Sequence, residues 1–230
     1  MTGFLIQKRK LTTMQLYVMA TGSSGNASIV KGEHENLAID FGLSFSKWQK
    51  LLDKNELDMP NEFFITHEHG DHLNQSGLNR LLSKFPSVNF HTNRGVFETT
   101  DFTVQAFLVP HDIENHGLVI TEKTTNEKLV YITDCSAMFQ TANSYKELLT
   151  GADYYALEAN YDEKFMENPD LLEQMNFKYN IFSGMGRHTS KQEALKTYAM
   201  LKKPSSTFTP LHKSSRFLIF SKNKEKLHAG

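Results

Sequence analysis

The sequence lacks the features that mark several protein classes. Cys135 is the single cysteine among 230 residues, so no internal disulfide can form and the usual thiolate ligands of a zinc finger are missing. No stretch approaches the roughly 20 apolar residues of a membrane-spanning helix. The formal net charge is −1, so no overall basic field indicates binding to nucleic acid.

The first residues also lack the pattern of a secretory signal. Residues 1–13 place a short apolar run before a basic cluster, whereas a signal peptide has basic residues before a long apolar region. We therefore expect a cytoplasmic protein that does not contact a membrane. Residues 1–13 are expected to be a disordered extension, and residues 14–230 are expected to form a single domain.

Charge is nevertheless uneven along the chain. Between Lys202 and Lys226 seven lysine or arginine residues stand against one acid, Glu225. Such a stretch indicates either a solvated basic tail or an edge that binds phosphate, and the sequence leaves both readings open.

Short β-rich runs with tight turns dominate the chain. β-branched and aromatic residues predict strands over residues 14–20, 26–32, 35–41, 62–66, 87–92, 101–110, 117–122, 128–133, 153–159 and 206–212. Helices are predicted over residues 44–55, 71–85, 144–152, 162–176 and 190–203, with an interruption at Pro169. Ser44 or Ser46 would cap the first, and Ser190 and Glu193 could form a capping box. This order predicts sheets packed face to face with helices outside.

Ten histidines are the compositional outlier, and three of them stand in one H-x-H-x-D-H motif. His67 and His69 are two apart at the end of a predicted strand, so in extended chain their imidazoles face the same side. Asp71 and His72 follow where a helix is predicted to start, and Gly70 is expected to permit a turn between the pairs. The spacing therefore favours two neighbouring metal positions over one.

Two metal ions need more ligands than this loop supplies. Three further ligand-type residues each stand where a predicted strand ends, the usual place for site residues on a rigid scaffold: His111, Asp134 and His212. The expected ligands form two groups bridged by Asp134: His67, His69 and His111 in one, and Asp71, His72 and His212 in the other. The H-E-x-x-H pattern of zinc proteases is absent.

The motifs together resemble the metallo-β-lactamase fold superfamily over nearly the whole chain. T-G-S-S-G-N at 21–26 is similar to the SGSSGN turn of its YycJ-like (WalJ-like) subgroup, and I-D-F-G at 39–42 to the first acidic motif. L-E-A-N-Y-D at 157–162 is similar to E-x-N-H-D. G-R-H-T-S at 186–190 resembles G-H-L-S, and L-H-K-S-S at 211–215 resembles L-H-L-S.

The resemblance implies an α/β (α+β) fold: a four-layer αββα sandwich in which helices flank two mixed sheets, with a dinuclear site at one edge. The metals would be two divalent ions, usually zinc and in some members manganese or iron. Asp40 would orient the metal-bound loop. Asp71 and His188 are the implied catalytic residues, and His188 would bind or protonate a phosphate-like group, as in ribonuclease Z and the phosphodiesterases of this superfamily.

Residues near the expected site favour an anionic substrate. Two divalent ions outweigh Asp71, Asp134 and a bridging hydroxide in formal charge, so the centre is net positive. Arg187 could hold a phosphate bidentately or lie in a solvated loop. Ser23 and Ser24 lie in a turn whose N–H groups could approach the metal site or an anion, or which could be a plain hairpin.

We therefore expect a metal-dependent hydrolase in which a dinuclear site activates a bridging hydroxide. The first hypothesis is a phosphodiesterase or nuclease that acts on nucleic acid, in particular a DNA exonuclease as the subgroup suggests. The alternative is a hydrolase of small esters, thioesters or lactones. A nuclease needs a basic track that leads to the site, whereas a small-ester hydrolase needs a closed pocket. A non-enzymatic metal-binding module fits the complete ligand set less well.

Overall fold

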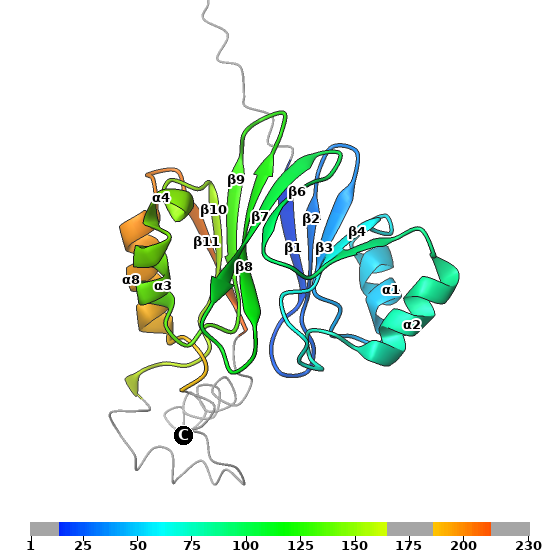
Figure 1. Cartoon of the computed structure of the whole chain (residues 1–230), viewed down its shortest axis with the longest axis horizontal. Helices are drawn as coiled ribbons and strands as arrows, with labels where there is room; N and C mark the ends of the chain where they lie inside the picture. The colour runs from blue at the N-terminus through cyan, green and yellow to red at the C-terminus, as the bar shows by residue number, and fades with distance from the viewer. Residues whose placement is uncertain (1–13, 165–185, 213–230) are drawn as a thin grey trace, which may run out of the picture.

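Two β-sheets packed face to face lie between two layers of helices in the computed structural model of the protein (Figure 1). The structure describes residues 14–164 and 186–212. This layering confirms the expected αββα sandwich. The extension over residues 1–13, most of the helix expected over 162–176 and the end of the basic stretch lie outside the described residues. The single domain over residues 14–230 stays a prediction.

The first sheet combines antiparallel and parallel pairs. In spatial order its strands are β1 (Gln15–Ala20), β2 (Ala27–Lys31), β3 (Asn36–Ile39), β4 (Glu62–Phe64) and β5 (Asn89–His91). β1, β2 and β3 pair antiparallel, and β3, β4 and β5 pair parallel. Helices α1 (Phe45–Lys54) and α2 (Gln75–Lys84) cover its outer face (Figure 1).

The second sheet is mixed in the same way. In spatial order its strands are β11 (Thr207–Leu211), β10 (Tyr154–Glu158), β9 (Lys128–Ile132), β8 (Asn115–Glu122), β7 (Phe102–Val109) and β6 (Gly95–Glu98). β9, β10 and β11 run parallel, and the others pair antiparallel. Its outer face is covered by α3 (Met138–Ser144), α4 (Lys146–Leu149) and α8 (Lys191–Leu201) (Figure 1).

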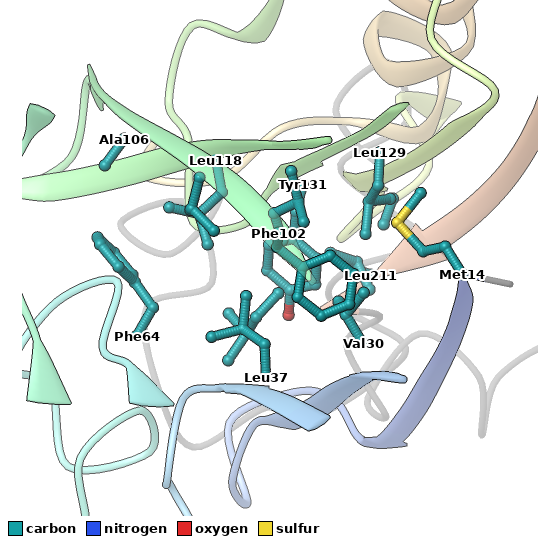
Figure 2. Close-up of a cluster of buried hydrophobic side chains, with 14 residues drawn as sticks. Met14, Val30, Leu37, Phe64, Phe102, Ala106, Leu118, Leu129, Tyr131 and Leu211 are labelled. Atoms are coloured by element: carbon teal, nitrogen blue, oxygen red, sulfur yellow. The ribbon is translucent and has the colours of Figure 1, made fainter. Parts of the chain in front are cut away.

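Side-chain alternation along the strands builds three apolar layers. Leu37 and Ile39 point into the core between the sheets, and Ala38 points to the core beneath α1 and α2. In the second sheet Tyr131 faces the central core, and Val130 faces the outer helices. Figure 2 shows the central core, where side chains from both sheets meet. Strands buried on both faces in this way are rigid supports for residues at their ends.

The ten predicted strands are confirmed, and within residues 14–164 and 186–212 two elements were not predicted. β6 was missed because Gly95 and largely exposed side chains give it no alternating pattern. α3 was missed because its seven residues, MFQTANS, include no acid in the first turn and no side chain caps its start. The predicted helices over 44–55 and 190–203 are confirmed as α1 and α8, and the one over 144–152 shortens to α4.

The start predicted for α2 at residue 71 is wrong. Leu73 forms a parallel bridge with Phe41, which keeps the preceding aspartate and histidine out of the helix. Asn74 is the cap, and its side chain accepts a hydrogen bond of 2.8 Å from the amide of Gly77. The helix therefore begins at Gln75 and leaves the ligand-type residues in a turn.

The expected capping box at α8 forms only in part. The Ser190 hydroxyl accepts a hydrogen bond of 3.0 Å from the amide of Glu193. The Glu193 carboxylate, however, accepts a hydrogen bond from the amide of Phe139 at 2.9 Å. It therefore satisfies a free amide of the first turn of α3, which has no side-chain cap of its own.

Across the described ranges, none of the helices combines the length and apolar character needed to span a bilayer. The cytoplasmic location stays a prediction.

Gly42 is expected to tolerate no side chain. A Cβ at this position would lie 1.7 Å from the carbonyl oxygen of Asp71, whereas a Cβ on Gly70 would meet nothing within 4 Å. Gly70 also has no left-handed backbone, so the turn does not need a glycine there and that expectation is wrong. We predict that Gly42→Ala destabilises the fold towards the upper end of the ~1–3 kcal/mol that overpacking costs.

Thermal unfolding of both alanine variants tests this prediction. Gly70→Ala is the matched control and should leave the midpoint of unfolding unchanged, while Gly42→Ala should lower it by roughly 2–4 °C for each kcal/mol lost. Equal midpoints for the two variants would contradict the close packing of Gly42 against the H-x-H-x-D-H loop.

Candidate metal centre

The expected ligands meet at one edge of the sandwich because their strands point that way. β7, β9, β10 and β11 run in one direction, so their carboxyl ends share an edge. His111, Asp134 and His212 follow three of these strands directly or within two residues. His67 follows β4 of the first sheet by three residues. Sheet packing therefore brings together residues that are far apart in the sequence.

Three imidazoles and one carboxylate form the first group. His67 Nε2 lies 3.1 Å from His69 Nδ1, and His111 Nε2 lies 3.3 Å from the same nitrogen. The nearer oxygen of Asp134 is 3.6 Å from His67 Nε2 and 3.9 Å from His111 Nε2. Three ring nitrogens that face one another cannot all donate protons, so their lone pairs fit a shared cation.

The second group shares Asp134 with the first. Asp71, His72, Asp134 and His212 each present a ligand atom within 4.8 Å of the others. His72 Nε2 lies 3.3 Å from the Asp134 carboxylate, and His212 Nε2 lies 3.7 Å from that of Asp71. His212 Nε2 is buried and makes no hydrogen bond. Such an atom is costly to bury unless a ligand satisfies it, so the residues fit a metal ion here as well.

Three residues of the site hold a backbone conformation that is unusual for any residue but glycine. The φ angle is 63° at Asp40, 50° at Asp134 and 49° at His212. Each stands at a strand end, and the left-handed conformation turns the chain sharply there. Residues other than glycine adopt it only where their surroundings over-determine it, and such strain gathers at functional sites.

Burial keeps two imidazoles of the first group, His67 and His111, neutral. It lowers the pKa of His67 to about 3, and the neighbouring His72 adds to this effect. Burial also lowers the pKa of His111. At neutral pH both rings therefore carry a free lone pair, the form in which histidine binds a metal.

Carboxylates dominate the second group. Burial would lower the pKa of His212, but Asp71, Glu158 and Asp134 outweigh it and raise the pKa to about 10. Burial opposes the ionisation of Asp134, yet its imidazole neighbours hold its pKa well below the usual range. Without a metal, protons balance this excess of negative charge. A divalent cation would take over that role and release protons.

Asp40 is fully buried and contacts His72, one of the expected ligands. Its carboxylate lies 2.7 Å from His72 Nδ1 and accepts hydrogen bonds from the amide and the hydroxyl of Thr66, both at 2.8 Å. The bond to His72 leaves Nε2 as the ring nitrogen that faces the second group. Carboxylate–histidine pairs of this kind fix the orientation of metal-ligating rings.

Sequence reasoning did not select Glu158, the last residue of β10. Its buried carboxylate lies 2.7 Å from His188 Nδ1 and 3.3 Å from His212 Nδ1, and it accepts hydrogen bonds from the amides of Cys135 and Thr189. Together with Asp134, Glu158 completes a third group of potential ligands that includes both histidines. The signal was present as the acid of L-E-A-N-Y-D, at a predicted strand end.

The turn at residues 21–26 contacts the ligands through Asn26. The Asn26 amide group donates a hydrogen bond to the Asp71 carboxylate at 3.3 Å and lies 2.8 Å from His72 Nε2. Ser23 and Ser24, the expected substrate contacts, are exposed at the tip of the turn. Sequence reasoning selected the two serines, although Asn26 and Thr21 of the same motif are the residues that contact expected ligands; the Thr21 hydroxyl accepts a hydrogen bond of 2.5 Å from the amide of His212.

Arg187 lies beside the first group and is held there by an acid that sequence reasoning also missed. Its guanidinium forms an ion pair of 2.7 Å with Asp112. The other oxygen of Asp112 lies 3.0 Å from His111 Nε2 and 3.4 Å from His69 Nε2. Asp112 directly follows an expected ligand, which is the one sequence signal that could have identified it. Arg187 remains half exposed.

Known proteins resemble this chain in sequence and in fold. No model of a protein family matches the chain. The chain is similar to exodeoxyribonuclease YycJ of Bacillus anthracis, with 25% identity over 201 residues that cover 77% of this chain and 74% of that protein. Exodeoxyribonuclease WalJ of Streptococcus pneumoniae is 25% identical over 202 residues, covering 76% of this chain and 72% of that protein.

Solved structures share the architecture at lower identity. Human tRNase Z, short form, superposes with a TM-score of 0.61 and 18% identity over 88% of this chain and 93% of that chain. YhfI from Bacillus subtilis, a metallo-β-lactamase fold protein, superposes with a TM-score of 0.61 and 14% identity, covering 88% of this chain and 87% of that chain. A diphosphatase of the PhnP family superposes with a TM-score of 0.56 and 14% identity, covering 86% of this chain and 85% of that chain. The layered sheets and these likenesses together show that the chain is a metallo-β-lactamase-fold protein.

Proposed function

We propose that the chain is a metal-dependent phosphodiesterase that cleaves nucleic acid, and specifically a DNA exonuclease. The observation that carries the proposal is Asp134, whose carboxylate is shared by two adjacent ligand groups, with His188 and Arg187 beside them. The bacterial relatives named exodeoxyribonucleases support the choice of DNA. A phosphate-binding edge between Lys202 and Lys226 would add to this, and it stays a prediction.

The proposed cofactor is a pair of zinc ions. Imidazole nitrogens and carboxylate oxygens are donors that suit zinc, with manganese or iron as alternatives. His67, His69 and His111 would hold one ion, Asp71, His72 and His212 the other, and Asp134 would bridge them. When bound, such a pair supplies Lewis-acid activation of the phosphodiester and lowers the pKa of water towards about 7.

His188 is proposed to deliver the proton that the leaving group needs. Its Nδ1 is held by the buried Glu158 at 2.7 Å, so Nε2 is the nitrogen left to face a substrate. Its ring lies 4.8 Å from that of His212 and 5.9 Å from that of His111, so it neighbours one expected ligand from each group. When the P–O bond to the leaving group breaks, a proton on Nε2 can pass to the departing oxygen.

Arg187 is proposed to bind the non-bridging oxygens of the phosphate. The ion pair with Asp112 holds its guanidinium beside the first ligand group, and half of the side chain remains accessible. Guanidinium groups recognise phosphate through two parallel N–H···O bonds, so the residue selects for an anionic substrate.

Because both ligand groups share Asp134, replacing this residue should remove more metal than replacing a residue of one group. Asp134→Asn is expected to remove more than one metal equivalent per chain, whereas Asp71→Asn should remove one. Phosphodiesterase activity should fall at least about 100-fold in both, the upper end of the cost of losing a residue that merely supports a ligand. Elemental analysis after gel filtration and hydrolysis of bis(p-nitrophenyl) phosphate provide the measurements. Asp53→Asn, at an exposed position on α1, is the control. Full metal content in Asp134→Asn would rule out the shared centre.

His188→Ala should separate catalysis from metal binding. We expect kcat on DNA to fall by roughly 10²–10⁴, the usual contribution of a general acid, at unchanged metal content. The loss should be much smaller with bis(p-nitrophenyl) phosphate, because p-nitrophenolate leaves without a proton. Loss of one metal equivalent would instead assign His188 to the third ligand group as a metal ligand.

Arg187→Met should separate a phosphodiesterase from a hydrolase of neutral esters. The variant should raise KM for DNA about tenfold, the loss of one charge-assisted hydrogen-bonded contact, and leave a neutral thioester or lactone unaffected. Steady-state kinetics on end-labelled single- and double-stranded DNA, RNA and a thioester give the comparison. Turnover of the thioester by the unaltered protein, together with inactivity on every polynucleotide, would overturn the proposed function.

A further inference from the structure

Thr66 lies between the end of β4 and the first metal-ligand candidate, and it is completely buried. Its amide and its hydroxyl both donate hydrogen bonds to the same carboxylate oxygen of Asp40, each at 2.8 Å. The hydroxyl oxygen also lies 3.1 Å from His67 Nδ1. The Thr66 hydroxyl thus stands between the Asp40 carboxylate and His67, and it also lies 3.4 Å from His72 Nδ1.

Counting protons decides the direction of each bond in this chain. A hydroxyl has one proton, and Thr66 gives it to Asp40, whose carboxylate only accepts. Towards His67 the hydroxyl must therefore accept, so the proton of that ring sits on Nδ1. This leaves the Nε2 lone pair facing His69 and Asp134, at 3.1 and 3.6 Å.

The same carboxylate controls a ring of the second group without an intermediary. His72 Nδ1 lies 2.7 Å from the other oxygen of Asp40 and must donate to it. Its Nε2 is then the nitrogen that faces Asp134, at 3.3 Å. Asp40 therefore touches one imidazole from each ligand group, one directly and one through Thr66.

The second sheet holds Thr66 in place from the opposite side. The backbone amide of His116, on β8, donates to the Thr66 carbonyl oxygen at 3.1 Å, and the His116 ring nitrogen Nδ1 lies 3.2 Å from the same oxygen. His116 is itself buried and its ring packs edge-on against Phe64. Because both sheets hold this residue, its hydroxyl has a fixed direction.

We propose that Thr66 is a positioning residue that relays the orientation of Asp40 to His67, so that one carboxylate sets the ring tautomer at both metal positions. This inference rests on the proposed metal centre and deepens it. The consequence is asymmetric: loss of the Thr66 hydroxyl releases the tautomer of His67 alone, because His72 keeps its direct bond to Asp40.

The test compares Thr66→Val, which keeps the shape but removes the hydroxyl, with Thr66→Ser, which keeps the hydroxyl. Long-range ¹H–¹⁵N NMR of the metal-free full chain reports which ring nitrogen carries the proton. His67 should be protonated on Nδ1 in the unaltered protein and in Thr66→Ser, and should lose that preference in Thr66→Val. Thermal unfolding shows whether each variant is folded.

Zinc titration of the same three proteins supplies the second readout. Thr66→Val should bind one metal equivalent about 10–100-fold more weakly, the usual cost of losing a group that orients a ligand, with the other equivalent and Thr66→Ser unchanged. Equal weakening of both equivalents, equal effects of the two variants, or an unchanged tautomer in Thr66→Val would overturn the relay.

Measurements on the unaltered protein distinguish failure of the Thr66 relay from failure of the proposed metal centre. If its His67 is protonated on Nε2 in the metal-free state, the relay is wrong whatever metal the protein binds, and this measurement does not require any variant to fold. If His67 is protonated on Nδ1 but the protein binds no divalent metal, the relay stands as a description of the hydrogen bonds and the proposed metal centre fails.

Discussion

Everything else at this edge of the protein depends on one electrostatic constraint: imidazoles and carboxylates from two ligand groups are buried side by side around Asp134. Burying a charged group costs several kcal/mol unless it is paired, hydrogen-bonded or bound to a cation. Asp134 is 2% exposed and faces histidines of both groups. The raised pKa of His212 shows the excess of negative charge around that ring, which a divalent cation would neutralise. The depressed pKa of the Asp134 carboxyl shows that the neighbouring histidines hold it ionised.

The sandwich meets this constraint with a rigid frame of backbone contacts. The amide of Asn26 donates to the carbonyl of Asp71 at 2.7 Å, and the amide of Phe41 donates to that of His72 at 2.8 Å. These bonds tie two loops of the first sheet to the ligand turn. The close approach at Gly42 is part of the same frame. Ligand positions thus follow from strands that are packed on both faces and cannot shift independently.

The site separates the groups that would hold metal from those that would meet substrate. The expected ligands stand on strand ends or on the turn before α2, whereas Arg187 and His188 lie on the loop that leads into α8. Glu158 and Asp112 connect the two parts, because each contacts the loop and one or more of the expected ligands. Loops positioned by a rigid scaffold are where substrate selection usually resides.

The sequence alone determined the layers and the ligand types. The runs of β-branched and aromatic residues are local patterns, and the strand prediction followed from them. The spacing of the H-x-H-x-D-H motif is also local, and the division of its ligands into two groups followed from it. Tertiary structure decided the rest. Glu158 and Asn26 reach the expected ligands through contacts between segments far apart in the chain, and the pairing of Asp112 with Arg187 is of the same kind. Leu73 delays the start of α2 by pairing with Phe41. No local pattern encodes these distances, because they arise from the packing of two sheets whose facing residues are remote in sequence.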